Sequence, residues 1–340
     1  MAKTQSFIEE LGRVWQLPDY VVVCCFDDAA NLAFALGDGS LYIVPGDGQP
    51  PVTIAAHTGA CLSLCAAPGQ GFLSGGDDGR FLAISVDGSI EQLGHYPGRW
   101  IEHVHSHSNG LVACSAGKQL HLIKPDRSSL TLEHPSSIGG LSFSPDGRQL
   151  AVAHYGGVSV HWTLVSDAKA KILKWAGSHL AVTWSPDARF VLTSMQENCL
   201  RGWRLKEPQD LHMSGYSTRV KSWSWLHGGR WLATNAGDCV ACWPFKKRSG
   251  PMGEAPITLA FRENGLVSAV AGDPKLPLVG VGYEDGLVLI AELDESATTE
   301  RAVMIKPPGN GAVTSMAFAP DGSRLVIGTA EGFVGIMPMA

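Results

Sequence analysis

The 340-residue chain has no run of 18 or more apolar residues, so we expect no transmembrane helix. Its first ten residues contain Glu9 and Glu10 where a secretory signal needs an apolar segment, which argues against export. Low-complexity tracts are absent, and only 17% of the residues are charged. The sequence also lacks a Gly-x-Ser-x-Gly elbow, a Walker phosphate loop and a Gly-x-Gly-x-x-Gly turn. These absences favour an ordered globular protein that is not an enzyme.

The eight cysteines lie mostly inside apolar, strand-like runs and do not form a disulfide framework. They are predicted to be small buried side chains that stay reduced. We therefore expect a cytoplasmic protein, and no cofactor is predicted.

The 40 glycines and 20 prolines are spread along the whole chain, which indicates frequent turns and many short strands. One pattern recurs about every 40 residues. Its clearest copy has an apolar run at Leu141–Phe143, a turn at Ser144–Gly147, a second run at Leu150–Ala153 and a third at Val158–Trp162. A poorer fourth strand fits in the segment between copies. Each copy thus predicts a small antiparallel sheet that is apolar on both faces and needs neighbours to be stable.

Eight copies can be counted when each is anchored on its second turn. The anchors are Gly39, Gly79, Gly117, Gly157, Asn198, Gly237, Gly286 and Gly332. The predicted repeats are approximately residues 20–55, 56–94, 95–134, 135–176, 177–214, 215–260, 261–306 and 307–340. This pattern predicts an all-β fold in which residues 1–340 form one closed β-propeller of four-stranded blades. Eight blades are predicted, with seven as the alternative.

The last copy ends at Met339, just after its third strand. Residues 1–19 are the only segment without an assigned element, so we expect them to supply the missing fourth strand. Either Thr4–Ile8 or Val14–Leu17 fits this role. A strand from the N-terminus would close the ring.

These residues resemble the WD-repeat family over essentially the whole chain. The resemblance depends on the turns Ser144-Pro-Asp-Gly147 and Ala319-Pro-Asp-Gly322 and on the segment Leu73–Gly79. The tryptophans Trp162, Trp203 and Trp243 also share one position in the third strand. No copy ends in the Trp-Asp dipeptide of the family. The resemblance implies a propeller that acts as a scaffold in protein–protein interactions.

Charge is distributed unevenly along the chain, whose net charge is −6. Residues 1–99 hold 4 basic and 11 acidic side chains, a net of −7, whereas residues 160–250 hold 13 and 6, a net of +7. The basic sector 201–248 has tryptophans between its charges, so it is an alternative binding surface for RNA or an acidic partner. Nucleic acid is disfavoured because the overall pI is about 6.0.

Two groups of residues suggest metal chemistry. His103 and His105 share a strand face, and Cys61 and Cys65 lie in the first strand of the preceding copy, so a metal-binding or hydrolytic site near the axis is an alternative function. The pair Cys239 and Cys242 lies in an alternating strand, not on a zinc-type turn. Because His105 occupies the position of Phe143 and Phe318 in other copies, packing is the preferred interpretation, and no metal is predicted.

The preferred function is binding of a protein partner. Fourth-to-first and second-to-third strand connections meet at one edge of a propeller, here called the rim. The exposed Tyr, Trp and Arg side chains expected there are the types enriched in interface hot spots. The predicted rim residues are Tyr96, Arg99, Trp100, Tyr155, Gln196, Glu197, Tyr216, Arg219, Lys221, Asn235, Tyr283 and Glu284. We expect a monomeric propeller within a hetero-complex, away from membranes.

Overall fold

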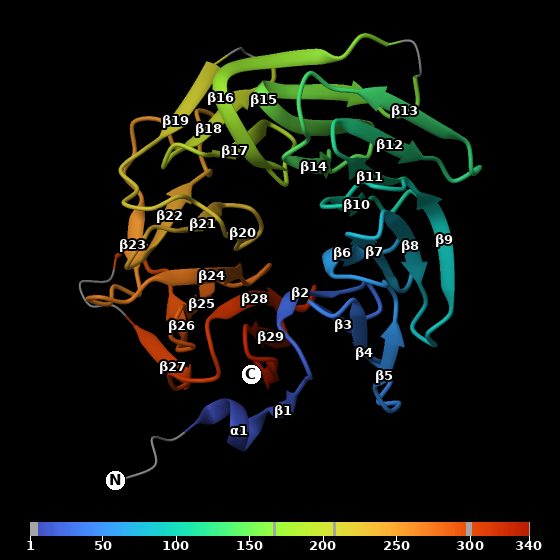
Figure 1. The fold of residues 1–340 in the computed structure, drawn as a ribbon. Helices are drawn as coiled ribbons and strands as arrows, with labels where there is room; N and C mark the ends of the chain where they lie inside the picture. The colour runs from blue at the N-terminus through green and yellow to red at the C-terminus, as the bar shows by residue number, and fades with distance from the viewer. Residues whose placement is uncertain (1–5, 166–167, 207–208, 297–300, 340) are drawn as a thin grey trace. The chain divides into compact units, whose positions relative to one another are not determined.

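The computed structural model describes residues 6–165, 168–206, 209–296 and 301–339. Figure 1 shows a succession of small antiparallel sheets, and α1 (Phe7–Leu11) is a short helix that precedes the first strand. The chain forms two compact units. The first unit is residues 25–214, and the second unit is residues 1–24 together with 215–340.

The first unit contains three four-stranded sheets and one six-stranded sheet. The first sheet is β2 (Val21–Phe26, which begins in the second unit), β3 (Leu32–Leu36), β4 (Ser40–Val44) and β5 (Val52–Ala55). The second sheet is β6 (Cys61–Ala66), β7 (Phe72–Gly76), β8 (Arg80–Ile84) and β9 (Ile90–His95). The third sheet is β10 (Val104–Ser106), β11 (Val112–Ala116), β12 (Gln119–Ile123) and β13 (Ser129–Glu133). The six-stranded sheet is β14 (Gly140–Phe143), β15 (Gln149–Trp162), β16 (Lys171–Trp184), β17 (Phe190–Met195), β18 (Leu200–Arg204) and β19 (Gln209–Met213).

The second unit contains three four-stranded sheets. One is β20 (Trp223–Leu226), β21 (Trp231–Asn235), β22 (Val240–Pro244) and β23 (Ile257–Leu259). The next is β24 (Val267–Gly272), β25 (Leu278–Tyr283), β26 (Val288–Glu292) and β27 (Ala302–Lys306). The last is β28 (Val313–Phe318), β29 (Arg324–Thr329), β30 (Phe333–Pro338) and β1 (Arg13–Gln16).

The second strand of the sheets is the most buried. Every residue of β3, β7, β11, β17 and β21 is buried. Strands that are buried on both faces have nearly continuous apolar sequences, and this is why simple alternation of apolar and polar residues is weak in this chain. The core therefore lies between successive sheets, as the repeat pattern predicts.

The structure has seven sheets, which is the alternative count, so eight separate blades was wrong. The fourth and fifth predicted repeats share the six-stranded sheet. β15 covers the predicted second and third strands of the fourth repeat, and β16 joins the fourth strand of that repeat to the first strand of the fifth. Tyr155 pairs with Ser178 beyond a register shift at Tyr155/Gly157, and this pairing joins the two repeats in one sheet. It explains why eight sequence repeats form seven sheets.

The N-terminal segment completes the last sheet, as predicted. β1 pairs antiparallel with β30, from Arg13 opposite Ile336 to Gln16 opposite Phe333. This confirms the Val14–Leu17 alternative. The other alternative, Thr4–Ile8, does not form a strand in its described part, because Phe7 and Ile8 belong to α1. Residues 4 and 5 lie outside the described residues. Ile8 is fully buried in a cluster with Leu325 and Phe333.

Glycine is required at the turn anchors because neighbouring backbone approaches them closely. Gly39 has φ +85°, and a Cβ there would lie 2.0 Å from the carbonyl oxygen of Gly59. Gly286 has φ +87° and would place a Cβ 2.0 Å from the carbonyl oxygen of Gly309. In both cases the second turn of one sheet touches the connection to the following sheet, and only glycine combines this φ with the space available.

Hydrogen bonds hold the second sheet to the connection before it. His57 Nε2 lies 2.8 Å from Ser74 Oγ, and His57 Nδ1 lies 3.0 Å from Asp78 Oδ1. The three aligned tryptophans differ in environment, because Trp203 and Trp243 are buried but Trp162 is 44% exposed.

Candidate functional site

The predicted rim residues of the first unit are exposed, with one exception. Trp100 is 61% exposed and Tyr155 is 64% exposed, and Arg99, Gln196 and Glu197 also face solvent. Tyr96 is half-buried because its ring stacks on His121, with centroids 4.0 Å apart. Burial raises the pKa of the Tyr96 hydroxyl, so this side chain stays neutral. Five of the six predicted rim residues of this unit therefore face solvent.

The backbone holds Trp100 and Tyr155 in place. The Arg99 N–H donates to Tyr96 O at 3.1 Å, and the Ile101 N–H donates to Gly76 O at 3.0 Å, so Trp100 lies between two anchored residues. The Tyr155 N–H donates to Ser136 Oγ at 2.9 Å. A partner would therefore meet aromatic side chains carried by a fixed backbone, which lowers the entropic cost of binding.

In the second unit the structure separates the predicted rim residues into two groups. Lys221 and Glu284 are exposed and Arg219 is half-buried, so these three are accessible. Tyr216, Asn235 and Tyr283 are buried and make internal hydrogen bonds. Asn235 Oδ1 accepts from the backbone N–H groups of Lys221 and Ser222, and the Tyr283 hydroxyl donates to Ala260 O. These three side chains stabilise the loops of the rim from inside and are not exposed for contact with a partner.

Replacing Tyr216 by Phe is expected to lower the free energy of unfolding by about 1–3 kcal/mol. The Tyr216 hydroxyl accepts a hydrogen bond from Trp243 Nε1 at 2.7 Å and lies 2.9 Å from Thr234 Oγ1. The variant leaves a buried indole N–H without its acceptor. Urea denaturation monitored by tryptophan fluorescence measures the loss, with Tyr20→Phe as control because Tyr20 is 44% exposed. Equal losses in both variants would contradict the structural role of Tyr216.

Sequence reasoning missed an exposed apolar pair at the rim of the second unit. Phe261 is 67% exposed and Leu266 is 44% exposed, in the connection between β23 and β24. This loop is held by the ion pair of Arg262 with Asp285 at 2.6 Å and by the Arg262 N–H, which donates to Asp238 O. Ala260 has φ +56°, a strained value for a residue with a Cβ. The available signal was Phe261 next to the Asn264-Gly265 turn, outside any strand pattern.

The weak metal candidates do not assemble. Cys61 Sγ lies 3.1 Å from Ser74 Oγ, and His105 packs its ring against Phe143, with centroids 5.7 Å apart. Burial lowers the pKa of His103 and of His105 to about 4 and raises that of Cys65 to about 12. Among the described residues, no group of three or more His, Cys, Asp or Glu side chains is placed to hold a metal ion. The four residues pack as core or half-buried side chains.

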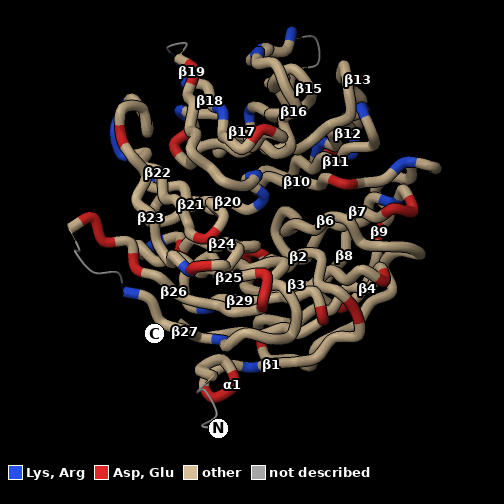
Figure 2. Tube along the Cα trace, turned by 60° about the vertical axis from the view of Figure 1, so that its left-hand side comes forward, with Lys and Arg blue, Asp and Glu red and all other residues tan. Residues whose placement is uncertain are grey.

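The basic sector 201–248 falls in both units, and several of its charged side chains are engaged. The Arg201 guanidinium lies over the Trp175 ring at 3.6 Å, and Lys246 lies over Trp231 at 4.5 Å. Lys247 pairs with Glu254 at 2.5 Å. Figure 2 shows the Lys and Arg residues beside β17 and β18 of the first unit. Because these cations stack on tryptophan rings or pair with a carboxylate, fewer basic side chains of the sector are available to bind a ligand.

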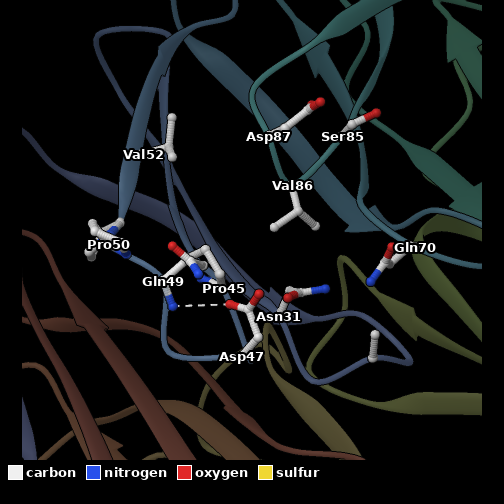
Figure 3. A pocket seen from close by; sticks show the side chains of 12 residues that line it. Asn31, Pro45, Asp47, Gln49, Pro50, Val52, Gln70, Ser85, Val86 and Asp87 are labelled. Atoms are coloured by element: carbon white, nitrogen blue, oxygen red, sulfur yellow. Dashed lines mark hydrogen bonds between the residues drawn. The ribbon is translucent and has the colours of Figure 1, made fainter.

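A groove opens at the opposite edge of the first unit, where first-to-second and third-to-fourth strand connections lie (Figure 3). Its volume is about 720 Å³. It lies between connections of the first and second sheets. The lining residues are Ala29, Asn31, Pro45, Asp47, Gln49, Pro50, Pro51, Val52, Gln70, Ser85, Val86 and Asp87. All of them except Val52, the first residue of β5, lie in connections between strands, so no pattern predicted the groove.

A buried carboxylate fixes the walls of this groove. Asp27 Oδ2 accepts from Asn31 Nδ2 and from the Gly71 N–H, each at 2.8 Å. Asn31 Oδ1 in turn accepts from the Gly46 N–H at 2.8 Å. These bonds tie a connection of the second sheet to two connections of the first, so the groove is formed before any ligand arrives.

Comparison with known proteins agrees with the fold. The family model "WD domain, G-beta repeat" matches residues 303–336, which lie in the last repeats. The WD repeat-containing protein 26 homolog of Arabidopsis thaliana is 23% identical over 214 residues, which cover 61% of this chain and 34% of that protein. The WD repeat-containing protein 1-B of Xenopus laevis is 24% identical over 239 residues, 66% of this chain and 37% of that protein. The chain thus spans about a third of the length of these relatives.

Solved structures show the same fold at low sequence identity. The computationally designed Ika8 protein has a TM-score of 0.76 at 16% identity, covering 99% of this chain and 100% of that one. A chain of the mitotic checkpoint complex has a TM-score of 0.67 at 16% identity, covering 100% and 98%. The WD40 repeats of RRP9 have a TM-score of 0.64 at 17% identity, covering 99% of each chain. The family match and the relatives support the predicted WD-repeat β-propeller family. None of the helices in the described residues has the length and apolar character to cross a membrane.

Proposed function

Because the chain is a β-propeller of the WD-repeat type, we propose that it is a non-catalytic scaffold that binds a protein partner through its rim. The observation that carries the proposal is the exposure of Trp100 and Tyr155 on anchored backbone in the first unit. Large aromatic side chains in water are energetically costly, and a partner that covers them gains apolar burial with little loss of side-chain freedom. Arg99 beside Trp100 adds a donor for a partner's carboxylate or carbonyl oxygens.

The same proposal includes a cytoplasmic location and a monomeric propeller within a hetero-complex. The eight cysteines are free thiols in the structure. Burial raises the pKa of Cys24 and of Cys65 to about 12, which keeps these thiols protonated and unreactive. This supports a reducing compartment.

Replacing Trp100 and Tyr155 together by Ala is expected to weaken partner binding at least about a hundredfold, because each hot-spot aromatic contributes on the order of 2 kcal/mol. The intact chain is immobilised, and the protein that it captures stoichiometrically from an extract of the native host is identified. The affinity of this purified partner is then measured for the intact chain and for the double variant.

Trp162→Ala is the matched control, since Trp162 is an exposed tryptophan at the far end of a strand of the same unit. Partner binding that survives the double substitution, or that is lost equally in the control, would contradict a role for this part of the rim.

A further inference from the structure

The groove of Figure 3 lies at the opposite ends of the strands from the rim, and the scaffold proposal makes no use of it. We propose that this groove is a second binding site, which takes an extended segment of a protein partner and holds a Lys or Arg side chain of that segment at Asp47. This goes beyond the proposed rim function, because it adds a site with its own ligand chemistry.

The size and the walls of the groove suit a long side chain with a charged end. About 720 Å³ lies within the usual range of ligand sites, roughly 300–1,000 Å³. Figure 3 shows Val86 projecting into the space from one side, with Pro45, Pro50 and Val52 on the other. The aliphatic stem of a Lys or Arg side chain packs well on such walls, while its charged end reaches a polar group.

Polar groups of the groove have hydrogen-bonding capacity that the protein does not use. Asp47 Oδ1 accepts from the Gln49 N–H at 3.0 Å, and within the described part of the chain Oδ2 has no hydrogen-bond or ion-pair partner. The side-chain amides of Gln49 and Gln70 are likewise without partners among the described residues. Such amides can pair with the N–H and C=O groups of an extended backbone, while a carboxylate binds a cation best.

The charge of the groove selects a basic segment over an acidic one. Its twelve lining residues include Asp47 and Asp87 and no Lys or Arg. The surrounding residues 25–100 hold 8 acidic and 2 basic side chains, a net of −6. Hydrogen bonds from the Ser89 N–H and hydroxyl lower the pKa of Asp87, which is therefore ionised at neutral pH. An acidic segment would meet repulsion here.

The groove is also preorganised. The Asp27 hydrogen bonds to Asn31 and Gly71 join the loops on its two sides. A segment that enters loses its own freedom but does not have to reorder the protein, so a short peptide should show measurable binding.

The test uses four fluorescent nine-residue peptide mixtures, randomised except for a central Arg, Lys, Ala or Glu, titrated against the full chain by fluorescence anisotropy. We expect the Arg and Lys mixtures to bind at least about tenfold more tightly than the Ala and Glu mixtures. Asp47→Asn keeps an oxygen that accepts the hydrogen bond from the Gln49 N–H, and it should weaken binding of the basic mixtures about tenfold. Val86→Trp, which fills the groove, should abolish binding of all mixtures.

Asp321→Asn is the matched control, because Asp321 accepts from the Ser323 N–H in a similar turn outside the groove. Equal binding of all four mixtures, binding of none, or affinity unchanged by Asp47→Asn and Val86→Trp overturns the proposal. The rim variant with Trp100 and Tyr155 replaced should bind the peptides normally, so failure of the rim proposal leaves this result intact.

Discussion

A chain with Ile8→Ala is expected to have a free energy of unfolding lower by about 3 kcal/mol than the intact chain. Ile8 is fully buried among Leu325, Phe333 and Val313, and its Cδ1 lies against Gly335, where an added Cβ would be only 2.4 Å away. The substitution leaves a cavity that this close backbone contact cannot fill. Urea denaturation followed by circular dichroism measures the change.

Leu11→Ala on the same helix is the control, because Leu11 is 62% exposed and its truncation should cost less than about 0.5 kcal/mol. Deleting residues 1–16 should be more severe than Ile8→Ala, since it also removes β1 and leaves β30 with an open edge. Similar stabilities of the Ile8→Ala and Leu11→Ala chains would show that the N-terminal segment does not anchor the last sheet.

Lowering the pH from 6.5 to 4.5 is expected to destabilise the first unit by up to about 5 kcal/mol per pH unit, which is about 1.4 kcal/mol for each of four buried histidines. Burial lowers the pKa of His103, His105, His134 and His161 to about 4 in the folded chain. The unfolded chain takes up these protons near pH 6.5, whereas the folded chain stays neutral until about pH 4. Protons bind more strongly to the unfolded state in this window, so stability is full above pH 6.5 and falls as the pH decreases towards 4.

The urea midpoint measured at several pH values tests this expectation. His105→Phe should make the dependence shallower by up to one proton, because Phe occupies the equivalent position in β14 and β28. His95→Gln is the control, since His95 is exposed. Turn carboxylates such as Asp126 and Asp321 have pKa values lowered by the hydroxyl groups of Ser128 and Ser323, so they contribute only at lower pH. A slope that His105→Phe leaves unchanged would show that these histidines do not cause the acid sensitivity.

Repeats and strand positions could be predicted because each turn constrains its own residues. Gly39 and Gly286 need positive φ and a close backbone approach, and both requirements are visible as glycine at a fixed period. The N-terminal strand was predicted from the incomplete last repeat. The structure has the alternative count of seven and not the preferred eight, because hydrogen bonding between Tyr155 and Ser178 depends on the path of two strands, which a repeat pattern does not encode.

Whether a rim side chain is exposed was harder to predict than whether the residue lies at the rim. Tyr216 and Tyr283 stand at rim connections, as Tyr155 does, yet they are buried, because each hydroxyl finds an internal partner. An aromatic residue with a polar end suits either environment, so residue type alone could not separate them. The groove was invisible for another reason, since Asp47 and Gln70 are 23 positions apart and meet only when two sheets pack.

The six-stranded sheet has a consequence for how this chain can change its length over evolution. In most repeat proteins, each repeat is a structural unit of its own that contacts only its neighbours. Here β15 folds back on itself, because the Thr163 N–H donates to Arg148 O at 3.0 Å, whereas β16 covers 14 residues and serves two repeats. An exchange between the fourth and fifth repeats would cut β16 in its middle, and each half would lose part of its sheet. Residues 140–213 should therefore be inherited as one indivisible block.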